Sequence, residues 1–222
     1  MPALFITGTG TGVGKTFVAC ALIRALRERG RVVDAFKPVV SGFDPADWAD
    51  SDPGQLLRAL GRTPDAAALE AMSPWRYAAP LSPDMAAARE GRMIDFDAVA
   101  ALCRRRLAEA GERVLLIEGV GGVMSPVSRA ATNLDLIIAL DIPVVMIAGR
   151  YLGTISHTLT AIAALRARGQ APRAVVISES EPDGPPLDET AASIARLAPG
   201  VAVIQAGGET AGWETRVLDV AV

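Results

Sequence analysis

Six short, mostly apolar runs recur along the chain and predict the strands of a sheet. They span residues 4–7, 31–36, 114–117, 144–147, 174–177 and 201–204. Their apolar residues follow one another instead of alternating with polar ones, which is typical of strands that are covered on both faces. We therefore expect these runs to be central strands of a parallel sheet.

Helical periodicity occupies the intervals between these runs. The predicted helices span residues 15–29, 95–110, 154–168 and 187–197. A glycine follows each of the first three, and Pro199-Gly200 follows the fourth, in positions where helices commonly end. This alternation predicts one α/β domain over residues 1–222, with a doubly wound, mainly parallel sheet flanked by helices. Such sheets bind their ligands at the carboxyl ends of the strands.

Two stretches depart from this alternation. Residues 41–83 are rich in Pro, Asp and Trp and show no clear period, so they predict a long irregular loop. Long loops in compact domains often carry function. The stretch 206–222 begins with several glycines and supports no assignment.

Composition and charge narrow the classes of partner. Half of the 222 residues are hydrophobic and the formal net charge is −3, so no basic field is present to bind nucleic acid. Neither a secretory signal pattern nor an apolar run of membrane-spanning length is found. Cys20 and Cys103 lack CxxC spacing, and we expect both to be buried free thiols. We therefore expect a cytoplasmic protein that binds neither nucleic acid nor a membrane.

The strongest chemical signal lies between the first predicted strand and the first predicted helix. There the sequence from Gly8 to Thr16 is GTGTGVGKT, which is typical of a loop whose backbone N–H groups surround phosphates. Lys15 would reach the β- and γ-phosphates of ATP, and the Thr16 hydroxyl would bind Mg²⁺. Five residues, not the usual four, separate Gly8 from Gly14, so Thr9 takes the place of the first glycine.

Charged residues follow two other predicted strands. Glu118 ends the run 114–117 and enters Gly-Val-Gly-Gly, where a carboxylate is well placed to bind Mg²⁺. Asp50 and Asp52 are equally good candidates, from the residues alone, for a second acidic ligand. Lys37 follows another strand and precedes Pro38, which holds its backbone extended at the same edge of the sheet.

Five motifs occur together in this order: GTGTGVGKT at 8–16, KPVVSG at 37–42, Ser51-Asp52, EGVGG at 118–122 and LGTISH at 152–157. Together they resemble the dethiobiotin synthetase family, whose fold is of the P-loop NTPase type. The resemblance covers residues 5–177 and is weaker beyond them. It implies an ATP- and Mg²⁺-dependent ligase that joins 7,8-diaminononanoate and CO₂ through a carbamate, with ADP and phosphate as by-products.

The resemblance also implies roles for individual residues. Lys15, Lys37 and Thr11 would be catalytic, and Thr16, Asp52 and Glu118 would bind the metal, which favours Asp52 over Asp50. The nucleotide would be bound by Gly12, Val13, Gly14, Lys15, Thr16, Phe17 and Ser178. The diamine substrate would be bound by Thr11, Lys37, Ser41, Gly121, Leu152, Gly153, Thr154 and Ser156. Its tail would cross a homodimer interface to the partner's predicted helix 154–168, passing near Gly122 and Pro126.

Several features leave alternatives open. Thr154 and Ser156 are equally well explained as caps of the helix that starts there. His157, the sole histidine, is interpreted as packed and hydrogen-bonded. The family commonly has Asn where this chain has Ser178, followed by Glu179-Ser180, and a Pro and Glu pattern where it has Gly207-Gly208-Glu209. ATP remains the expected nucleotide, with weak discrimination between bases.

Three other functions compete with the ligase. A P-loop ATPase switch of the partitioning type would usually carry a second lysine early in the loop, where this chain has Thr9-Gly10-Thr11. An amide-forming ligase of the cobyrinic acid type would need a glutamine-hydrolysing domain, for which no sequence remains after Val222. An inactive nucleotide-binding module would not need the intact Lys15, Thr16, Lys37 and Glu118.

Overall fold

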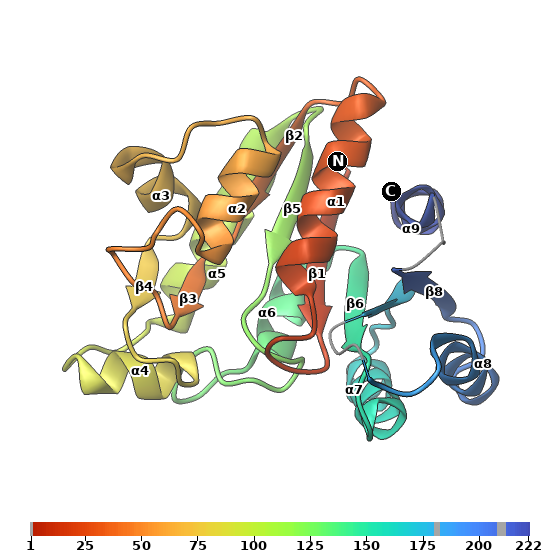
Figure 1. Ribbon diagram of the computed structural model, residues 1–222. Helices are drawn as coiled ribbons and strands as arrows, with labels where there is room; N and C mark the ends of the chain where they lie inside the picture. The colour runs from red at the N-terminus through yellow and green to blue at the C-terminus, as the bar shows by residue number, and fades with distance from the viewer. Residues whose placement is uncertain (1, 180–182, 208–211) are drawn as a thin grey trace.

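The computed structural model describes residues 2–179, 183–207 and 212–222, and in these residues six strands form one parallel sheet (Figure 1). The strand order across the sheet is β2-β5-β1-β6-β7-β8. The strands are β1 (Ala3–Gly8), β2 (Val33–Phe36), β5 (Val114–Glu118), β6 (Val144–Gly149), β7 (Ala174–Ser178) and β8 (Ala202–Ala206). Because β1 lies between β5 and β6, the loop that follows it emerges at the centre of the sheet.

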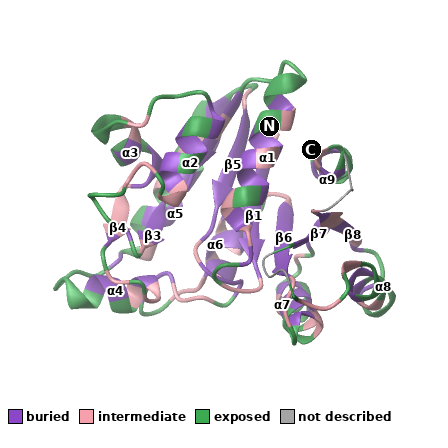
Figure 2. Ribbon diagram, in the orientation of Figure 1, coloured by how far each residue is buried: buried purple, intermediate pink, exposed green. Residues whose placement is uncertain are grey.

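Helices cover both faces of the sheet. The apolar side chains of β1 alternate between two hydrophobic clusters, with Leu4 and Ile6 in one and Phe5 in the other. The first cluster packs against α1 (Lys15–Glu28), α2 (Asp52–Ala59), α3 (Ala66–Met72) and α9 (Trp213–Ala221). The second packs against α4 (Pro83–Arg89), α5 (Phe96–Ala110), α6 (Asn133–Leu140), α7 (Thr154–Ala167) and α8 (Leu187–Leu197). Figure 2 shows the buried strands between helices that expose one side to solvent.

The expected α/β class is confirmed, and the predicted strands and helices are all present with shifts of one or two residues at their ends. The expectation that every strand is central is wrong for β2 and β8, which form the two edges of the sheet. Three of the five residues of β8 are only half-buried. The apolar run that predicted β8 therefore belongs to an edge strand.

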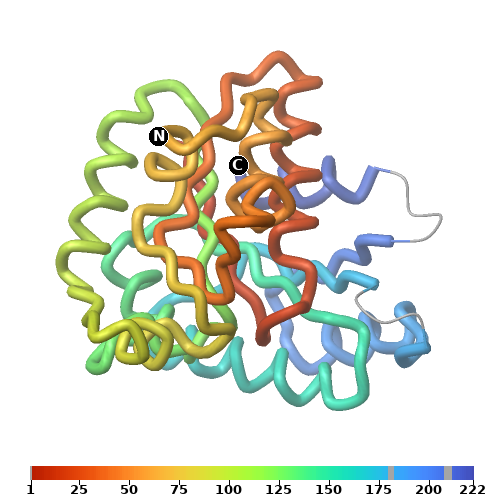
Figure 3. Tube along the Cα trace, turned by 60° about the vertical axis from the view of Figure 1, so that its left-hand side comes forward, coloured from red at the N-terminus to blue at the C-terminus, as the bar shows by residue number. Residues whose placement is uncertain are grey.

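The expectation of a long irregular loop over residues 41–83 is wrong. This part of the chain contains α2, α3 and the start of α4, together with a second, two-stranded parallel sheet of β3 (Val39–Ser41) and β4 (Trp75–Tyr77). Figures 1 and 3 show these elements gathered beside the β2 end of the main sheet. Ser51 caps α2 by accepting from the Gly54 N–H, and Asp65 caps α3 in the same way from Ala68. Ser and Asp are residue types that favour the start of a helix, so both caps leave a local signal in the sequence.

Two further helices were not predicted. Helix α6 is a single eight-residue stretch of mostly apolar residues, closed at its start by a capping box between Thr132 and Asp135. Helix α9 follows Gly212 and buries Trp213 and Val217 against the sheet. The described residues include no helix long and apolar enough to cross a membrane.

Candidate active site

The phosphate loop connects β1 to α1 at the carboxyl edge of the sheet. Gly12 and Gly14 have φ angles of 73° and 88°, in the left-handed region that favours glycine. At Gly14 a Cβ atom would also lie 2.5 Å from Ser178 Oγ, so no larger residue fits. The Lys15 side chain folds back over the loop, and its Nζ donates to the Gly10 carbonyl at 2.6 Å.

Lys37 lies just after β2, and its backbone is fixed on both sides. Its N–H donates to the Met72 carbonyl at 3.1 Å, and the Ser73 hydroxyl donates to the Lys37 carbonyl at 2.6 Å. These bonds hold the residue where β2 gives way to β3. Only 3% of the Lys37 side chain is exposed, so its ammonium must find partners inside the protein.

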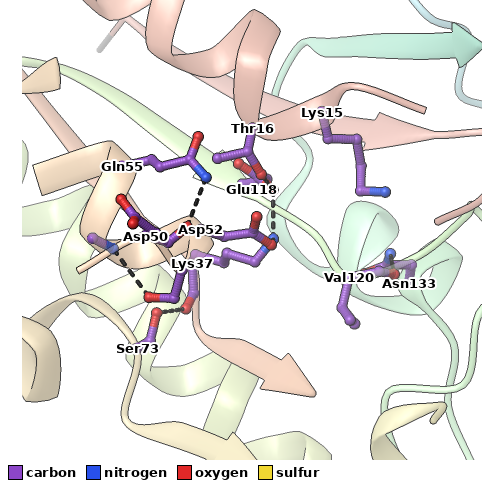
Figure 4. A network of polar contacts seen from close by, with 12 residues as sticks. Lys15, Thr16, Lys37, Asp50, Asp52, Gln55, Ser73, Glu118, Val120 and Asn133 are labelled. Atoms are coloured by element: carbon purple, nitrogen blue, oxygen red, sulfur yellow. Dashed lines mark hydrogen bonds and ion pairs between the residues drawn. The ribbon is translucent and has the colours of Figure 1, made fainter. Parts of the chain in front are cut away.

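Two carboxylates provide those partners (Figure 4). Lys37 Nζ lies 2.8 Å from Asp52 Oδ2 and 2.5 Å from Glu118 Oε1. The Thr16 hydroxyl donates to the same Glu118 oxygen at 2.8 Å. Side chains from α1, α2, β5 and the end of β2 therefore meet at one point, although Thr16 and Glu118 are 102 positions apart in the sequence.

The pKa values in this cluster follow from burial and charge. Burial and the neighbouring Lys37 lower the pKa of the Lys15 ammonium to about 8. Burial alone would lower the pKa of Lys37, but the Glu118 and Asp52 carboxylates outweigh it and raise this pKa well above its usual range. Burial would raise the pKa of Asp52, but Lys37 outweighs it and the pKa is lowered. Lys37 and Asp52 are therefore both charged near neutral pH.

The structure distinguishes the two candidate aspartates. Asp52, the first residue of α2, points toward Lys37 and Thr16. Asp50 is exposed and accepts from Arg58 at 2.7 Å. Only Asp52 therefore joins the cluster.

A cavity of about 410 Å³ opens beside the cluster. This volume is within the usual range for a small-molecule site. Its lining contains most of the residues expected to bind phosphates or the reacting end of the substrate. They are Thr11, Gly12, Gly14, Lys15, Thr16, Phe17, Lys37, Ser41, Asp52 and Gly121, together with Val40 and Val120. Glu118 lies behind this surface with 2% of its side chain exposed.

The segment after Glu118 packs tightly against the phosphate loop. A Cβ atom at Gly122 would lie 3.0 Å from the Thr9 carbonyl, which explains why this position needs glycine. Asn133, which was not predicted, donates to the Val120 carbonyl at 2.5 Å and to the Gly122 carbonyl at 3.1 Å. The Ser125 hydroxyl accepts from the Gly122 N–H at 2.7 Å. Sequence spacing gave no signal for Asn133, because its contacts depend on how α6 packs.

Ser178 and Phe17 lie on different sides of the loop. The Ser178 hydroxyl is buried and donates to the Val13 carbonyl at 2.6 Å, so it contacts the loop and is not part of the cavity lining. Phe17 lines the cavity, is 56% exposed, and stacks on Trp213 with ring centroids 6.4 Å apart. Of the two, only Phe17 is open to a nucleotide in this structure. Ser180, Gly208 and Glu209, where the sequence differs from the pattern common in the family, lie outside the described residues.

The segment 152–156 at the start of α7 does not line the main cavity. Leu152 is 93% exposed and Ser156 is exposed, whereas Thr154 is buried. Gly153 occupies the N-cap position with φ 99°, and no side chain caps the helix, so the alternative that Thr154 and Ser156 cap α7 is wrong. Pro126, expected near the substrate path, forms a short antiparallel bridge with Thr132.

His157 differs from its expected environment. The histidine is exposed, but its ring lies against that of Tyr151 with ring centroids 5.6 Å apart. It is hydrogen-bonded as expected, because its Nδ1 lies 2.8 Å from the Tyr151 hydroxyl. The same hydroxyl lies 3.4 Å from Thr9 Oγ1. Tyr151 and His157 line a smaller hollow of about 310 Å³ on the other side of the phosphate loop. Both cysteines are buried and free, as expected.

A parallel sheet with a glycine-rich loop between β1 and α1, opening on a cavity with two lysines, defines a P-loop nucleotide-binding protein. A family model described as "AAA domain" matches residues 2–206. One chain of the MinC:MinD cell division protein complex of Aquifex aeolicus superimposes with a TM-score of 0.56 at 11% identity, covering 98% of this chain and 86% of that one. This likeness supports the fold alone.

Sequence relatives are much closer. The ATP-dependent dethiobiotin synthetase BioD of Caulobacter sp. (strain K31) is 56% identical over 219 residues, which are 98% of this chain and 93% of the relative. The protein of the same name from Caulobacter vibrioides (strain NA1000 / CB15N) is 55% identical over 190 residues, 86% of this chain and 85% of the relative. The chain belongs to the family of ATP-dependent dethiobiotin synthetases. The resemblance expected from its motifs is confirmed.

Proposed function

We propose that this chain catalyses ATP-dependent dethiobiotin synthesis, the activity for which its relatives are named. In this reaction an amine of 7,8-diaminononanoate and CO₂ form a carbamate, and ATP phosphorylates one carbamate oxygen. The second amine attacks the carbonyl carbon, a C–N bond forms, the C–O bond breaks, and phosphate leaves. The chain is thus a C–N bond-forming ligase. The observation that carries the proposal is the convergence of Lys15, at the start of α1, and Lys37, just after β2, on one cavity beside Thr16 and Asp52.

The phosphate loop supplies the proposed nucleotide site. Backbone N–H groups of Gly12–Phe17 at the start of α1 favour anions, because the first N–H groups of a helix have no partner within it. Lys15 adds a positive charge that now contacts the Gly10 carbonyl and is free to turn to the phosphates. Phe17 offers an aromatic face to the base. Ser178 supports the loop through Val13, so we propose that it acts on the nucleotide indirectly.

We propose that Thr16, Asp52 and Glu118 hold Mg²⁺. They supply one hydroxyl and two carboxylates, which are the hard oxygen donors that this ion prefers. Glu118 Oε2 is buried and accepts no hydrogen bond within the described part of the chain, which fits a ligand oxygen awaiting a partner. The described residues form no cluster of three or more His, Cys, Asp or Glu side chains, so phosphate oxygens and water would complete the coordination. Bound Mg²⁺ would neutralise charge on the phosphates.

The reacting end of the diamine is proposed to lie between the two lysines. Lys37, Ser41, Thr11 and Gly121 share the cavity with Lys15. Two positive charges stabilise the transferring phosphoryl group more than the separated reactants, because negative charge develops between them. Little covalent chemistry is required of the protein, and most of its effect comes from position and charge.

We further propose a homodimer, in which the apolar tail of the substrate crosses to the start of the partner's α7. The exposed Leu152 and the exposed Met124 support such an interface, since large apolar side chains of this kind gain from being covered. The positive end of the helix dipole at the start of α7 suits the tail carboxylate. A cytoplasmic location is also proposed, because both cysteines are free and buried.

The direct test of the function is ADP release by the purified protein with Mg-ATP and bicarbonate, with and without 7,8-diaminononanoate, while dethiobiotin is followed by mass. Diamine-dependent ADP release with a matching amount of dethiobiotin is expected. ADP release that is indifferent to the diamine would instead support the partitioning-type switch, to which the chain is related by fold alone.

A further inference from the structure

The two lysines of the candidate active site are the only lysines in the sequence, and all other strongly basic residues are arginines. They are held in different ways. Lys15 Nζ contacts a backbone carbonyl, that of Gly10. Lys37 Nζ contacts the two carboxylates of Asp52 and Glu118, at 2.8 Å and 2.5 Å. We call Asp52 and Glu118 the acidic pair.

The acidic pair therefore already holds a cation. The Lys37 ammonium lies between its two carboxylates, beside the Thr16 hydroxyl, and its side chain is almost fully buried. Without a cation the pair would be unfavourable, because the side chain of Glu118 is only 2% exposed and water could not balance its charge beside that of Asp52, whose side chain is 42% exposed. Lys37 thus balances in this structure the carboxylate charge of Asp52 and Glu118, which bound Mg²⁺ would balance in the proposed metal site.

The two cations cannot both occupy this position. Mg²⁺ binds its oxygens at about 2.0–2.1 Å. An ion held by Asp52 Oδ2 and by either oxygen of Glu118 would lie against the ammonium, because Lys37 Nζ is 2.8 Å from that Asp52 oxygen and 2.5 Å from Glu118 Oε1. The proposed chemistry also requires Lys37 beside the carbamate and the transferring phosphoryl group. Lys37 already lines the cavity, and its four-carbon side chain is flexible enough to turn into it.

We propose that Lys37 is the resident counter-cation of the acidic pair while no metal is bound, and that metal binding displaces its ammonium into the substrate cavity. The inference rests on the proposed function and deepens it, because it makes Lys37 available to the carbamate only after the metal has entered. Lys37 then has two positions, one as a structural ion-pair partner and one as a catalytic residue.

The test compares Lys37→Met with Lys15→Met in protein free of nucleotide. Each variant removes one ammonium from the same cavity, but only Lys37 contacts the acidic pair. Mn²⁺ binding is measured by electron paramagnetic resonance, and the unfolding midpoint is measured in EDTA and in Mg²⁺. For Lys37→Met we expect Mn²⁺ to bind about tenfold tighter or more than to the wild type. We also expect a low unfolding midpoint in EDTA that Mg²⁺ restores. Lys15→Met should show neither effect.

Equal Mn²⁺ affinity in Lys37→Met and the wild type would overturn the inference. A second measurement needs no change at Lys37, in case that variant does not fold. In protein labelled with ¹⁵N-lysine, Lys15→Arg identifies the Lys37 ammonium signal, because only two lysines exist. Mg²⁺ with a non-hydrolysable ATP analogue should shift this signal and speed its exchange with water. An unchanged Lys37 signal would also overturn the inference.

Failure of the inference and failure of the proposed metal site have different signatures. If Lys37→Met binds Mn²⁺ like the wild type, but Glu118→Gln loses Mg-dependent nucleotide binding, the metal site stands and the displacement of Lys37 is wrong. If Glu118→Gln binds Mg-ATP and forms dethiobiotin as the wild type does, the metal ligands themselves are wrong, and the inference is overturned with them.

Discussion

Glu118 links the start of α1 to the end of β2. Its Oε1 accepts hydrogen bonds from Thr16 and Lys37, while its Oε2 is buried without a partner in the described residues. It also ends β5, where Gly119 allows the chain to pass close to Asn133. A change at this side chain that keeps its shape but removes its charge therefore tests the acidic pair with little effect on packing.

We expect Glu118→Gln to keep the fold and to lower Mg-dependent turnover by about 10²–10³-fold, because one metal ligand loses its charge. ADP release as a function of Mg²⁺ concentration measures the effect. Asp50→Asn is the matched control, since Asp50 is exposed and pairs with Arg58. Turnover of Glu118→Gln within twofold of Asp50→Asn would contradict the assignment.

Lys15 makes nucleotide binding sensitive to pH. Burial and Lys37 lower the pKa of Lys15 to about 8, so the free protein loses this charge as the pH rises above that value. Phosphates favour the protonated form, and binding then requires uptake of a proton. In metal-free buffer we expect ADP affinity to fall by about tenfold per pH unit above this pKa. Lys15→Arg should abolish the fall, because arginine stays charged. A titration curve with the same slope in both proteins would refute the role of Lys15.

At the scale of elements, the site depends on how β7 supports the phosphate loop. Ser178, the last residue of β7, donates to the Val13 carbonyl, and Gly14 leaves room for it. The phosphate loop is thus held by two contacts. Ser178 of β7 binds its Val13 carbonyl, and Gly122 packs against its Thr9 carbonyl. Such contacts set the direction of the loop N–H groups before the nucleotide arrives.

Ser178→Ala should lower the free energy of unfolding by about 1–3 kcal/mol, because the buried Val13 carbonyl loses its partner. ADP affinity should fall in the same variant. Chemical denaturation and calorimetric ADP titration check the two effects. Thr160→Ala, on the exposed side of α7, should change stability by less than about 0.5 kcal/mol. If Ser178→Ala behaves like Thr160→Ala, β7 does not position the loop.

The elements differ in how far the sequence predicted them. Long helices such as α1 and α5 repeat their apolar positions over several turns, so their period is visible. Helices α2, α3 and α4 have seven or eight residues, too few for a period, and only their caps mark them. Helix α6 is apolar on nearly every side and has the composition of a buried strand.

At the scale of the whole molecule, some residues of the site were predictable from the sequence and others were not. Lys37 and Glu118 follow predicted strands directly, and Lys15 ends the phosphate loop after another strand, so their meeting at one edge of the sheet follows from the fold class. The choice between Asp50 and Asp52 depended on the start of α2, and the contacts of Asn133 depended on the packing of α6. Contacts that arise from tertiary packing leave no local pattern in the sequence.

The proposed dimer can be tested by introducing one charged side chain at the expected interface. We expect the wild type to be a dimer by light scattering and Leu152→Glu to be largely monomeric, because a carboxylate would be buried in the interface. Val32→Glu is the control, since Val32 is also exposed but precedes the edge strand β2 at its amino end, whereas Leu152 follows β6 at its carboxyl end. A Leu152→Glu protein that stays dimeric would place the interface elsewhere.

The central claim is that this cavity transfers the γ-phosphoryl group of ATP to a carbamate formed from CO₂. A short incubation with C¹⁸O₂, unlabelled ATP and 7,8-diaminononanoate tests it, with mass analysis of the released phosphate. The account predicts one ¹⁸O atom in each phosphate, because the phosphorylated carbamate oxygen leaves with phosphorus, and one in the carbonyl of dethiobiotin. Labelled dethiobiotin accompanied by unlabelled phosphate would contradict it.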